Sequence, residues 1–465
     1  MLTPLDSRVM DLNAEHLGVS TSELMTNAGK AVADVILERF ADKRVRIFCG
    51  RGNNGGDGLA CAGFLPDAKI SMIDGRDMKS QASRSAMSAV ISRIEDFNGS
   101  ESDFDVLVDA GLGTGISGEL RPIWDRYVDF CNDFEGIIIS IDVPTGFGAA
   151  KQVVPDMTVT MVDVKEGMNS GNSGDIIVAD IGMPIEAGMF VGPGDILRYP
   201  IPRKTCHKGD MGRVLIVGGG PYFGAPAFCA RSAMRIGADM VYVATPSRTV
   251  QFIVSHAPEA MIIESGDDHL TPKNVEKIIE ASAKCDVVLI GPGLGTSPDT
   301  IEAVHSIMKE SLAPLVIDAD GITALSTYKG TLPAGSVVTP HLSEFKKIGG
   351  KERDPKDVVE VADHLGCNIL LKGAVDIISD GASICLNDTG CPAMASAGTG
   401  DILAGAVAGL VGRGMDSFDA AKLAAWIVGK AGESVFSDYS YGLCASDLED
   451  GIAKVLSAAL KDAGI

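Results

Sequence analysis

The sequence predicts an α/β protein of two domains, and three observations support this prediction. Its 465 residues exceed what one ordinary hydrophobic core accommodates, so two domains are expected. Short apolar runs rich in β-branched residues alternate with segments of helical periodicity along the whole chain. Glycine occupies 55 positions, which suits many tight loops between strands and helices. We therefore predict two successive βα series with parallel or mixed sheets.

Strands are predicted first over 45–50, 105–110 and 136–144, where apolar runs end in Gly, Asp or Pro. Near-continuous apolar runs of this kind are typical of strands buried on both faces of a parallel sheet. A Pro- and Gly-rich stretch at 189–204 follows, and we predict domains over 1–200 and 206–465. The second series of strands is predicted over 213–220, 240–246, 286–293, 314–320, 336–341 and 368–373.

Composition excludes several classes of protein. The net charge is −22, from 40 basic and 62 acidic residues, so a nucleic-acid partner is not expected. The ten cysteines form no Cys-x-x-Cys pair, which favours reduced thiols in a cytoplasmic protein. The sequence contains neither a signal-peptide pattern nor a run of 18 apolar residues, so no membrane span is expected.

Three glycine-rich loops follow the predicted strands of the first half: GRGNNGGDG (50–58), DAGLGTGISGE (109–119) and DVPTG (142–146). Ligands of open α/β sheets bind beyond the carboxyl ends of the strands, so these loops are expected to converge on one pocket. One such loop alone would be only a turn. Asp57, Asp109 and Asp142 would supply carboxylates to the pocket, where oxygen ligands could also bind a hard cation.

The second half repeats this arrangement, with GPGLG (291–295), TPHLSE (339–344) and LKG (371–373) at predicted strand ends, and AGTGD (397–401) follows further along the chain. The last motif precedes a segment with apolar residues at helical spacing, 399–412. The first turn of such a helix offers free amides and a partial positive charge, which suit a phosphate. An aspartate there is usually a helix cap. Because glycines precede Asp401, we predict instead a phosphoryl site with Asp401 as a base toward an attacking hydroxyl, ionised at neutral pH.

These motifs resemble those of a known family. GTGD resembles the anion hole and base of the ribokinase-like superfamily, and with GPGLG, TPHLSEF and LKG it resembles the ADP/ATP-dependent NAD(P)H-hydrate dehydratases. The first half, with GRGNNGGDG, DAGLGTGISGE and SIDVPTG, resembles the NAD(P)H-hydrate epimerases. The order and length are similar to those of the bifunctional NAD(P)H-hydrate repair enzymes. The resemblance implies an N-terminal Rossmann-like three-layer α/β sandwich and a C-terminal ribokinase-like α/β domain.

The resemblance also implies a repair function. The epimerase would interconvert the R and S hydrates of NADH and NADPH (NADHX and NADPHX). The dehydratase would phosphorylate the S hydrate and eliminate phosphate, with ADP as donor and AMP as product. Expected cofactors are K⁺ in the first domain and Mg²⁺ with ADP in the second. A homo-oligomer such as a tetramer is also implied.

Residue by residue, the resemblance assigns Asp401, Asp57 and Asp142 as catalytic. It assigns hydrate binding in the first domain to Asn53, Asn54, Gly55, Gly56, Asp57, Gly113, Thr114, Gly115, Ile116, Ser117, Gly118, Glu119 and Asp142. It assigns hydrate binding in the second to Ala225, Gly293, Gly295, His341 and Asp401, and nucleotide binding to Lys372, Gly373, Ala374, Val375, Asp376 and Gly400. The potassium ligands would be Asn54, Asp109 and Thr145.

Three positions depart from the family pattern: Ser343 stands where glycine is usual, Asp376 where threonine is usual, and Cys391 where asparagine is common. Two alternatives remain open at this point. The second domain could be a ribokinase-like small-molecule kinase that releases a phosphorylated product. The first could be a non-catalytic nucleotide-binding module. The sequence does not decide between ADP and ATP, between NADHX and NADPHX, or which carboxylate performs epimerisation.

Overall fold

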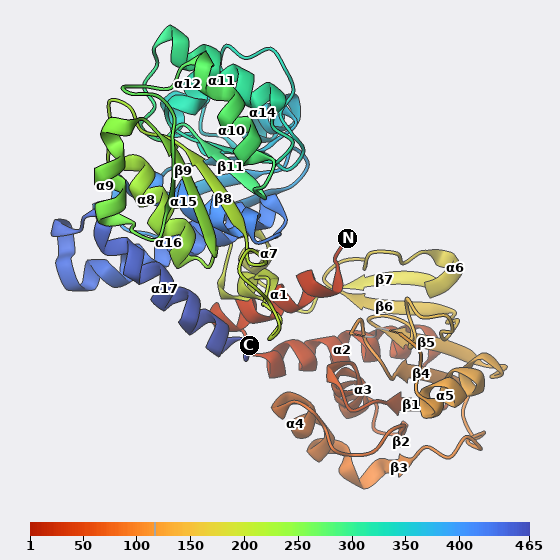
Figure 1. Ribbon diagram of the computed structural model, residues 1–465. Helices are drawn as coiled ribbons and strands as arrows, with labels where there is room; N and C mark the ends of the chain where they lie inside the picture. The colour runs from red at the N-terminus through yellow and green to blue at the C-terminus, as the bar shows by residue number, and fades with distance from the viewer. Residues whose placement is uncertain (116–117) are drawn as a thin grey trace. The chain divides into compact units, whose positions relative to one another are not determined.

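The computed structural model describes residues 1–115 and 118–465, which fold as two compact units, Met1–Ala187 and Gly188–Ile465 (Figure 1). Residues just after the division belong to the second unit. The amide of Val191 donates to the Leu386 carbonyl at 2.8 Å, and Ile196 and Tyr199 are buried in the second core. The assignment of the two activities to 1–200 and 206–465 stays a prediction.

Within its described residues, the first unit contains a seven-stranded parallel sheet of order β3-β2-β1-β4-β5-β6-β7. Register is continuous across the centre, where Phe48 of β1 pairs with Asp109 of β4 and Asp109 with Ser140 of β5. The strands are β1 (Val45–Cys49), β2 (Lys69–Met72), β3 (Ile94–Asp96), β4 (Val106–Ala110), β5 (Ile137–Ile141), β6 (Met157–Met161) and β7 (Asp175–Ala179).

Alternation along β1 separates two cores on opposite faces of this sheet. Ile47 and Cys49 pack with the buried residues of α2 and α3, whereas Phe48 packs with Trp124 and Tyr127 of α5. The unit is therefore a three-layer α/β sandwich, as predicted. Its helices are α1 (Pro4–His16), α2 (Thr21–Phe40), α3 (Asn53–Phe64), α4 (Gln81–Val90), α5 (Pro122–Asn132) and α6 (Ser170–Ser173), and α7 (Glu186–Met189) spans the division.

The second unit contains a nine-stranded mixed sheet among the residues that the structure describes, of order β10-β9-β8-β11-β12-β13-β14-β15-β16. The pairs are parallel up to β14, and β14-β15-β16 is an antiparallel meander. The strands are β8 (Arg213–Val217), β9 (Met240–Thr245), β10 (Met261–Glu264), β11 (Val287–Ile290), β12 (Leu315–Ile317), β13 (Val337–Val338), β14 (Asn368–Leu371), β15 (Asp376–Ser379) and β16 (Ile384–Asn387).

Helices cover both faces of this sheet. Val214 and Ile216 of β8 pack with α8, α15, α16 and α17, while Leu215 and Val217 pack with α10, α11 and α14. The helices are α8 (Ala225–Arg235), α9 (Val250–His256), α10 (Val275–Ser282), α11 (Pro298–Glu310), α12 (Asp320–Leu325), α13 (Leu342–Lys347), α14 (Pro355–Leu365), α15 (Thr399–Gly412), α16 (Ser417–Tyr439) and α17 (Ala445–Asp462).

Helix α15 is apolar on all sides, as expected for a helix that is buried between α8, α16 and the sheet. Its glycines permit the close approach of α8. A Cβ on Gly405 would lie 2.4 Å from the Cys229 carbonyl oxygen, and one on Gly409 would lie 3.0 Å from that of Ala233. The helix that begins at the GTGD motif is thus held rigidly in the core of the second unit.

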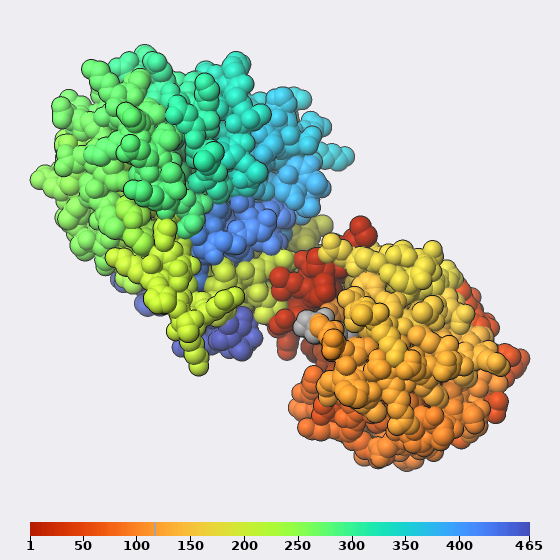
Figure 2. Space-filling model, turned by 45° about the vertical axis from the view of Figure 1, so that its right-hand side comes forward, coloured from red at the N-terminus to blue at the C-terminus, as the bar shows by residue number. Residues whose placement is uncertain are grey.

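All nine strands predicted from the sequence are present, with ends within a few residues of those expected. Seven further strands, β2, β3, β6, β7, β10, β15 and β16, were not predicted. In the space-filling view, N-terminal atoms of the first unit lie against atoms of residues near 160–180, in agreement with a parallel bridge between Leu2 and Lys165 (Figure 2). Of the helices within residues 1–115 and 118–465, none is long and apolar enough to cross a membrane.

Candidate active sites

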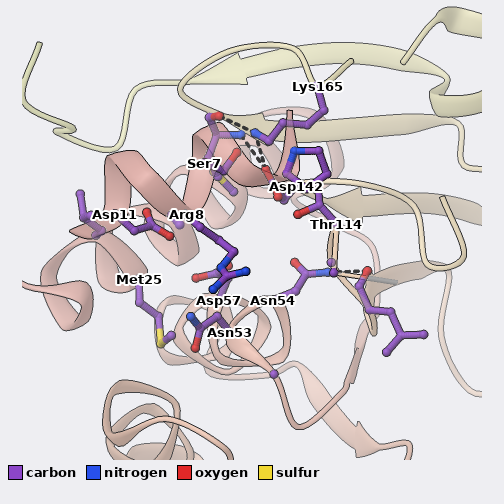
Figure 3. A pocket seen from close by; sticks show the side chains of 18 of the residues that line it. Ser7, Arg8, Asp11, Met25, Asn53, Asn54, Asp57, Thr114, Asp142 and Lys165 are labelled. Carbon is purple, nitrogen blue, oxygen red and sulfur yellow. Dashed lines mark hydrogen bonds and ion pairs between the residues drawn. The ribbon is translucent and has the colours of Figure 1, made fainter. Parts of the chain in front are cut away.

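The first unit holds a cavity of about 740 Å³ at the carboxyl ends of its central strands. Loops after β1, β4 and β5 reach it, as predicted, and helix α1 and the start of α3 complete its walls (Figure 3). The predicted site residues that line it are Asn53, Asn54, Asp57, Gly113, Thr114, Gly115 and Asp142. Gly118 and Glu119 are exposed and are not among the lining residues, and Ile116 and Ser117 lie outside the described residues.

Gly55 and Gly56 act through the backbone and are not part of the cavity wall. A Cβ on Gly55 would lie 1.8 Å from the Gly50 carbonyl oxygen, and one on Gly56 would meet the Met25 side chain at 2.6 Å. Only glycine therefore allows the loop after β1 to turn directly into α3. This turn brings Asn53, Asn54 and Asp57 to the cavity on the first turns of the helix.

Two carboxylates in the cavity have different environments. Burial, followed by the neighbouring charges of Asp142 and Asp11, raises the pKa of Asp57 well above its usual range. The Asp142 carboxylate is instead 2.8 Å from the Nζ atom of the buried Lys165. Asp142 adopts a positive φ of 62°, which aspartate tolerates better than most residues and which suits a functional site. The cavity thus contains one carboxyl whose pKa burial raises and one carboxylate paired with a lysine.

Behind the cavity wall, Asp109 organises the loops after β4 and β5. This fully buried carboxylate accepts five hydrogen bonds, from the Thr145 amide and hydroxyl, the Ser140 and Tyr127 hydroxyls and the Gly111 amide. Burial nevertheless raises its pKa. Thr145 is also fully buried, and its Oγ1 accepts from the Leu112 amide at 2.9 Å.

The third predicted potassium ligand, Asn54, has an unsatisfied acceptor. Its Nδ2 donates to the Leu112 carbonyl at 3.3 Å, whereas its buried Oδ1 has no partner among the described residues. An unpaired buried amide oxygen can serve as a ligand of an oxygen-seeking cation, and Asn54 Nδ2 and Thr145 Oγ1 both bond to the backbone of Leu112. Over the same residues, no group of three or more His, Cys, Asp or Glu side chains is arranged to hold a metal ion.

In the second unit, Asp401 lies in the first turn of α15 but does not cap it. The N-cap is Gly398, at a φ of 94°, and no side chain caps the helix there. Among residues 1–115 and 118–465, no hydrogen-bond partner of the Asp401 carboxylate is found, although the group is largely enclosed. The structure therefore offers no capping role that would explain this carboxylate.

The environment of Asp401 raises the pKa of its carboxyl group. Burial raises its pKa to about 7, and the carboxylates of Asp318 and Asp320 add to the rise, against the lowering effect of Lys372. The positive end of the helix was expected to keep Asp401 ionised at neutral pH. Desolvation and the two neighbouring carboxylates oppose this effect of the helix terminus, so Asp401 holds its proton to a higher pH than an ordinary aspartate. A base with a pKa near 7 is well matched to proton transfer at neutral pH.

Lys372 brings a positive charge to the same place. Its Nζ is 2.7 Å from the carboxylate of Asp318, which also accepts from the Thr339 hydroxyl at 2.8 Å. A Cβ on Gly400 would lie 3.4 Å from Lys372 Nζ, so the amide turn of α15 and the lysine face one site. Helix-terminal amides and a lysine together suit a transferring phosphoryl group.

The other predicted positions surround this centre. The amide of Gly295 donates to the Asp320 carboxylate at 2.8 Å, and Gly293 lies against the Tyr222 carbonyl, where a side chain would clash. His341 caps α13 by accepting from the Glu344 amide at 3.2 Å, and Ala225 begins α8. The His341 side chain is 55% exposed, and its Nε2 lies 3.5 Å from the Glu344 carboxylate.

The lysine loop forms a turn between β14 and β15. Gly373, Ala374 and Val375 are exposed, and the Asp376 carboxylate accepts from the Gly373 amide at 2.8 Å and from Asn387 Nδ2 at 3.0 Å. The Asp376 side chain thus stabilises the turn by accepting a hydrogen bond from the backbone of Gly373. Burial raises the pKa of this carboxyl, whose position the family usually fills with threonine.

The sequence analysis missed four side chains that the structure places at these sites: Asp11, Lys165, Asp318 and Asp320. Asp318 and Asp320 lie at the end of the strand predicted over 314–320, so their position was a usable signal. Asp11 lies on α1 and Lys165 follows an unpredicted strand, so no motif marked them.

Together, the fold and the sites define a phosphoryl-transfer unit with a helix-terminal anion site, joined to a binding unit with a carboxylate-lined cavity. Family models agree with this class: residues 214–454 match the NAD(P)H-hydrate dehydratase model, and residues 21–167 match the YjeF-related protein N-terminus model. The chain belongs to the family of bifunctional NAD(P)H-hydrate repair enzymes, because full-length members are more than 30% identical to it.

One such relative, the bifunctional NAD(P)H-hydrate repair enzyme of Methanothermobacter thermautotrophicus, is 36% identical, and the alignment covers 98% of this chain and 95% of the relative. The enzyme of the same name from Archaeoglobus fulgidus is 34% identical, with 97% of each chain covered.

Among solved structures, the ADP/ATP-dependent NAD(P)H-hydrate dehydratase of Bacillus subtilis, co-crystallised with ATP/Mg²⁺, matches 58% of this chain and 98% of its own. The TM-score is 0.52 and the identity 25%. A ribokinase-like superfamily protein of Enterococcus faecalis, 23% identical with a TM-score of 0.52 over 58% of this chain and 96% of its own, shows the same fold. The C-terminal unit is therefore ribokinase-like, as predicted.

Proposed function

We propose that this chain repairs hydrated NADH and NADPH with two activities: epimerisation of the hydrates and nucleotide-dependent dehydration to NAD(P)H. Membership of the repair-enzyme family over 98% of the chain is the observation that supports this most strongly. The geometry agrees with it, because one unit offers a carboxylate-lined cavity and the other offers a base beside helix-terminal amides and a lysine.

For the dehydratase we propose that Asp401 accepts the proton of the hydrate hydroxyl as its oxygen attacks the terminal phosphorus of ADP. The amides of the 398–400 turn and Lys372 would stabilise the transferring phosphoryl group, and AMP would leave. The phosphorylated carbon would then lose phosphate, and the adjacent carbon a proton, which restores the double bond of NAD(P)H. Phosphorylation is needed because hydroxide is a poor leaving group and phosphate a good one.

We further propose that ADP is the phosphoryl donor and that it binds together with Mg²⁺. A relative of 25% identity was crystallised with ATP/Mg²⁺ and is described as ADP/ATP-dependent, which supports a nucleotide with Mg²⁺ here. The nucleotide would lie against Lys372–Asp376 and Gly400, and the hydrate against Ala225, Gly293, Gly295 and His341.

For the epimerase we propose that Asp57 is the acid and that Asp142, held by Lys165, is its ionised counterpart. Burial raises the pKa of Asp57, which favours its acid form, whereas the Asp142 carboxylate is 2.8 Å from Lys165 Nζ. A protonated Asp57 can give its proton to the hydroxyl as the C–O bond breaks. Water then adds to the opposite face of the ring and returns a proton, so only the configuration changes. Asn53, Gly113 and Thr114 would orient the substrate in the cavity.

We further propose K⁺ at Asn54, Asp109 and Thr145, supported by the unpaired Asn54 Oδ1. One formal charge among amide, carboxylate and hydroxyl oxygens favours a monovalent ion. A bound ion would fix the loop that carries Asn54. A crystal structure grown in potassium salt tests this: an octahedral ion with ligands at about 2.1 Å, the geometry of Mg²⁺, would contradict it.

Two proposals concern the molecule as a whole, namely a homo-oligomer such as a tetramer and a cytoplasmic location. Both come from the family resemblance. Sedimentation of the purified chain measures the first, and fractionation of the source cells measures the second.

The alternative, a small-molecule kinase fused to a non-catalytic module, differs in its product. Incubation of the protein with the S hydrate and ADP should yield NADH, AMP and inorganic phosphate in equal amounts. A phosphorylated hydrate that accumulates without NADH would instead identify a kinase.

A further inference from the structure

Helix α1 forms one wall of the first unit's cavity, although no motif discussed above includes it. Seven lining residues come from the first eleven positions of the chain: Leu2, Pro4, Leu5, Ser7, Arg8, Met10 and Asp11. The family model for this half begins only at residue 21. The helix is therefore a part of the site to which neither the family model nor the sequence motifs assign a role.

The position of α1 is fixed at both ends. The Leu2 amide donates to the Val164 carbonyl and the Glu166 amide to the Leu2 carbonyl, each at 2.9 Å, beside Lys165. Near the other end, Asn13 Nδ2 donates to the Ala187 carbonyl at 3.1 Å. The buried residues of the helix, Val9, Asn13 and Ala14, hold one side against the core. Pro4, Ser7, Arg8 and Asp11 recur at helical spacing and face the cavity.

Arg8 extends from this helix into the cavity and has no partner there (Figure 3). Other basic side chains of the wall are already engaged: Arg51 and Arg121 lie 3.2 and 2.9 Å from Asp74, and Lys165 pairs with Asp142. Within the part of the chain that the structure describes, the Arg8 side chain has no ion pair and no hydrogen bond, and of the wall's basic side chains only that of Lys79 shares this.

The charge of the cavity differs from that of the chain. The chain has 62 acidic and 40 basic residues, yet the wall contains five basic side chains (Arg8, Arg51, Lys79, Arg121 and Lys165) and four acidic ones (Asp11, Asp57, Asp74 and Asp142). A local excess of cations in an acidic protein suits an anionic ligand. A guanidinium binds phosphate oxygens in a bidentate manner, which a lysine cannot do.

We infer that Arg8 of α1 binds a phosphate group of the dinucleotide hydrate in the epimerase cavity. This inference rests on the proposed epimerase function and adds a substrate-binding residue to it. The phosphate is either one of the pyrophosphate bridge, present in both substrates, or the 2′-phosphate, present in NADPHX alone. Arg8 binds and orients the substrate; it takes no part in proton transfer.

The test compares epimerisation of NADHX and NADPHX by the full chain and by Arg8→Gln. Loss of a charged hydrogen bond predicts a KM raised about 10- to 100-fold, with kcat within about twofold. A rise for both substrates identifies the pyrophosphate, and a rise for NADPHX alone identifies the 2′-phosphate. Inorganic pyrophosphate, as a competitor, should inhibit the wild type better than the variant in the first case.

Arg39→Gln is the matched control, because it removes the same charge from an exposed surface pair with Asp175 in the same unit. Its KM should equal that of the wild type. An Arg8→Gln enzyme with unchanged KM for both substrates would overturn the inference and leave the proposed function intact. Failure of the wild type to epimerise either hydrate would instead refute the proposed function. Arg8→Lys should recover only part of the affinity, which separates a bidentate contact from general attraction.

Discussion

At the scale of single residues, Asp401 decides whether the second unit is a catalyst of phosphoryl transfer. Asn has nearly the shape of Asp and caps helices about as well, so Asp401→Asn removes only the base. We predict a dehydratase rate lower by about 10²- to 10⁴-fold, the usual contribution of a positioned base. Nucleotide affinity and epimerase activity should change little. Near-normal turnover would mean that the carboxylate is only structural.

Stability provides the control for this variant. The folded state raises the pKa of Asp401 from its ordinary 3.8 to about 7, so between these values it binds more protons than the unfolded state. Ionisation of Asp401 therefore lowers the free energy of unfolding as pH rises through this range. Asp401→Asn should be at least as stable as wild type at pH above 7. A large drop in melting temperature would show that the lost activity reflects misfolding.

The same pKa predicts the pH dependence of dehydration. A general base must be deprotonated, so kcat/KM should fall as pH drops below about 7 and level off above it. The measurement is kcat/KM against pH for the S hydrate at saturating ADP. If kcat/KM instead falls only near pH 4, the ordinary range of an aspartate, then either Asp401 is not the base or the bound nucleotide removes the effect of burial on its pKa.

The residues of the two sites could be predicted only where a motif marks them. Asp57, Asp142, Lys372 and Asp401 belong to glycine-containing motifs, and the structure brings each to a site. The direction of the pKa shift of Asp401 could not be predicted, because the desolvation of its carboxyl group depends on tertiary packing. Lys165 and Arg8 reach the cavity from segments without any motif, so only the folded chain reveals them.

At the scale of elements, the start of α15 is the feature that the second site depends on. Gly400 lies within the helix, where alanine is the better helix former, yet a Cβ there would stand 3.4 Å from Lys372 Nζ. Gly400→Ala should therefore keep the melting temperature while it weakens nucleotide binding and dehydration by intruding on the phosphoryl site. Isothermal titration with ADP and a thermal melt measure the two effects.

The matched control is Gly63→Ala in α3, which has no atom within 4 Å of the new Cβ and should leave dehydration unchanged. Gly398→Ala differs from both. Its positive φ of 94° and a Cβ 2.9 Å from that of Ala445 should destabilise the fold itself. If Gly400→Ala were as active as Gly63→Ala, the turn of α15 would not be the phosphoryl site.

The elements most easily predicted were the strands at the centres of the two sheets, because burial on both faces makes them continuously apolar. The missed strands are short or polar. β3 reads IED and β7 reads DIIVA, and both lie at sheet edges, while β6 alternates threonine with apolar residues. β14 pairs with β15 and β15 with β16 in the antiparallel direction. Strands β15 and β16 were not predicted, so this antiparallel meander was not predicted either.

At the scale of the whole molecule, the central claim is that one chain performs both epimerisation and dehydration. The most direct measurement supplies the protein with ADP and the R hydrate alone, and follows the absorbance band of reduced nicotinamide. Wild type should convert the R hydrate completely to NADH, because epimerisation feeds the dehydratase. The Asp142→Asn variant, whose new side chain tolerates the positive φ, should convert the R hydrate only at the slow uncatalysed rate of epimerisation. It should still consume the S hydrate at the wild-type rate. If wild type consumes the S hydrate and leaves the R hydrate untouched, the account of the first unit is contradicted.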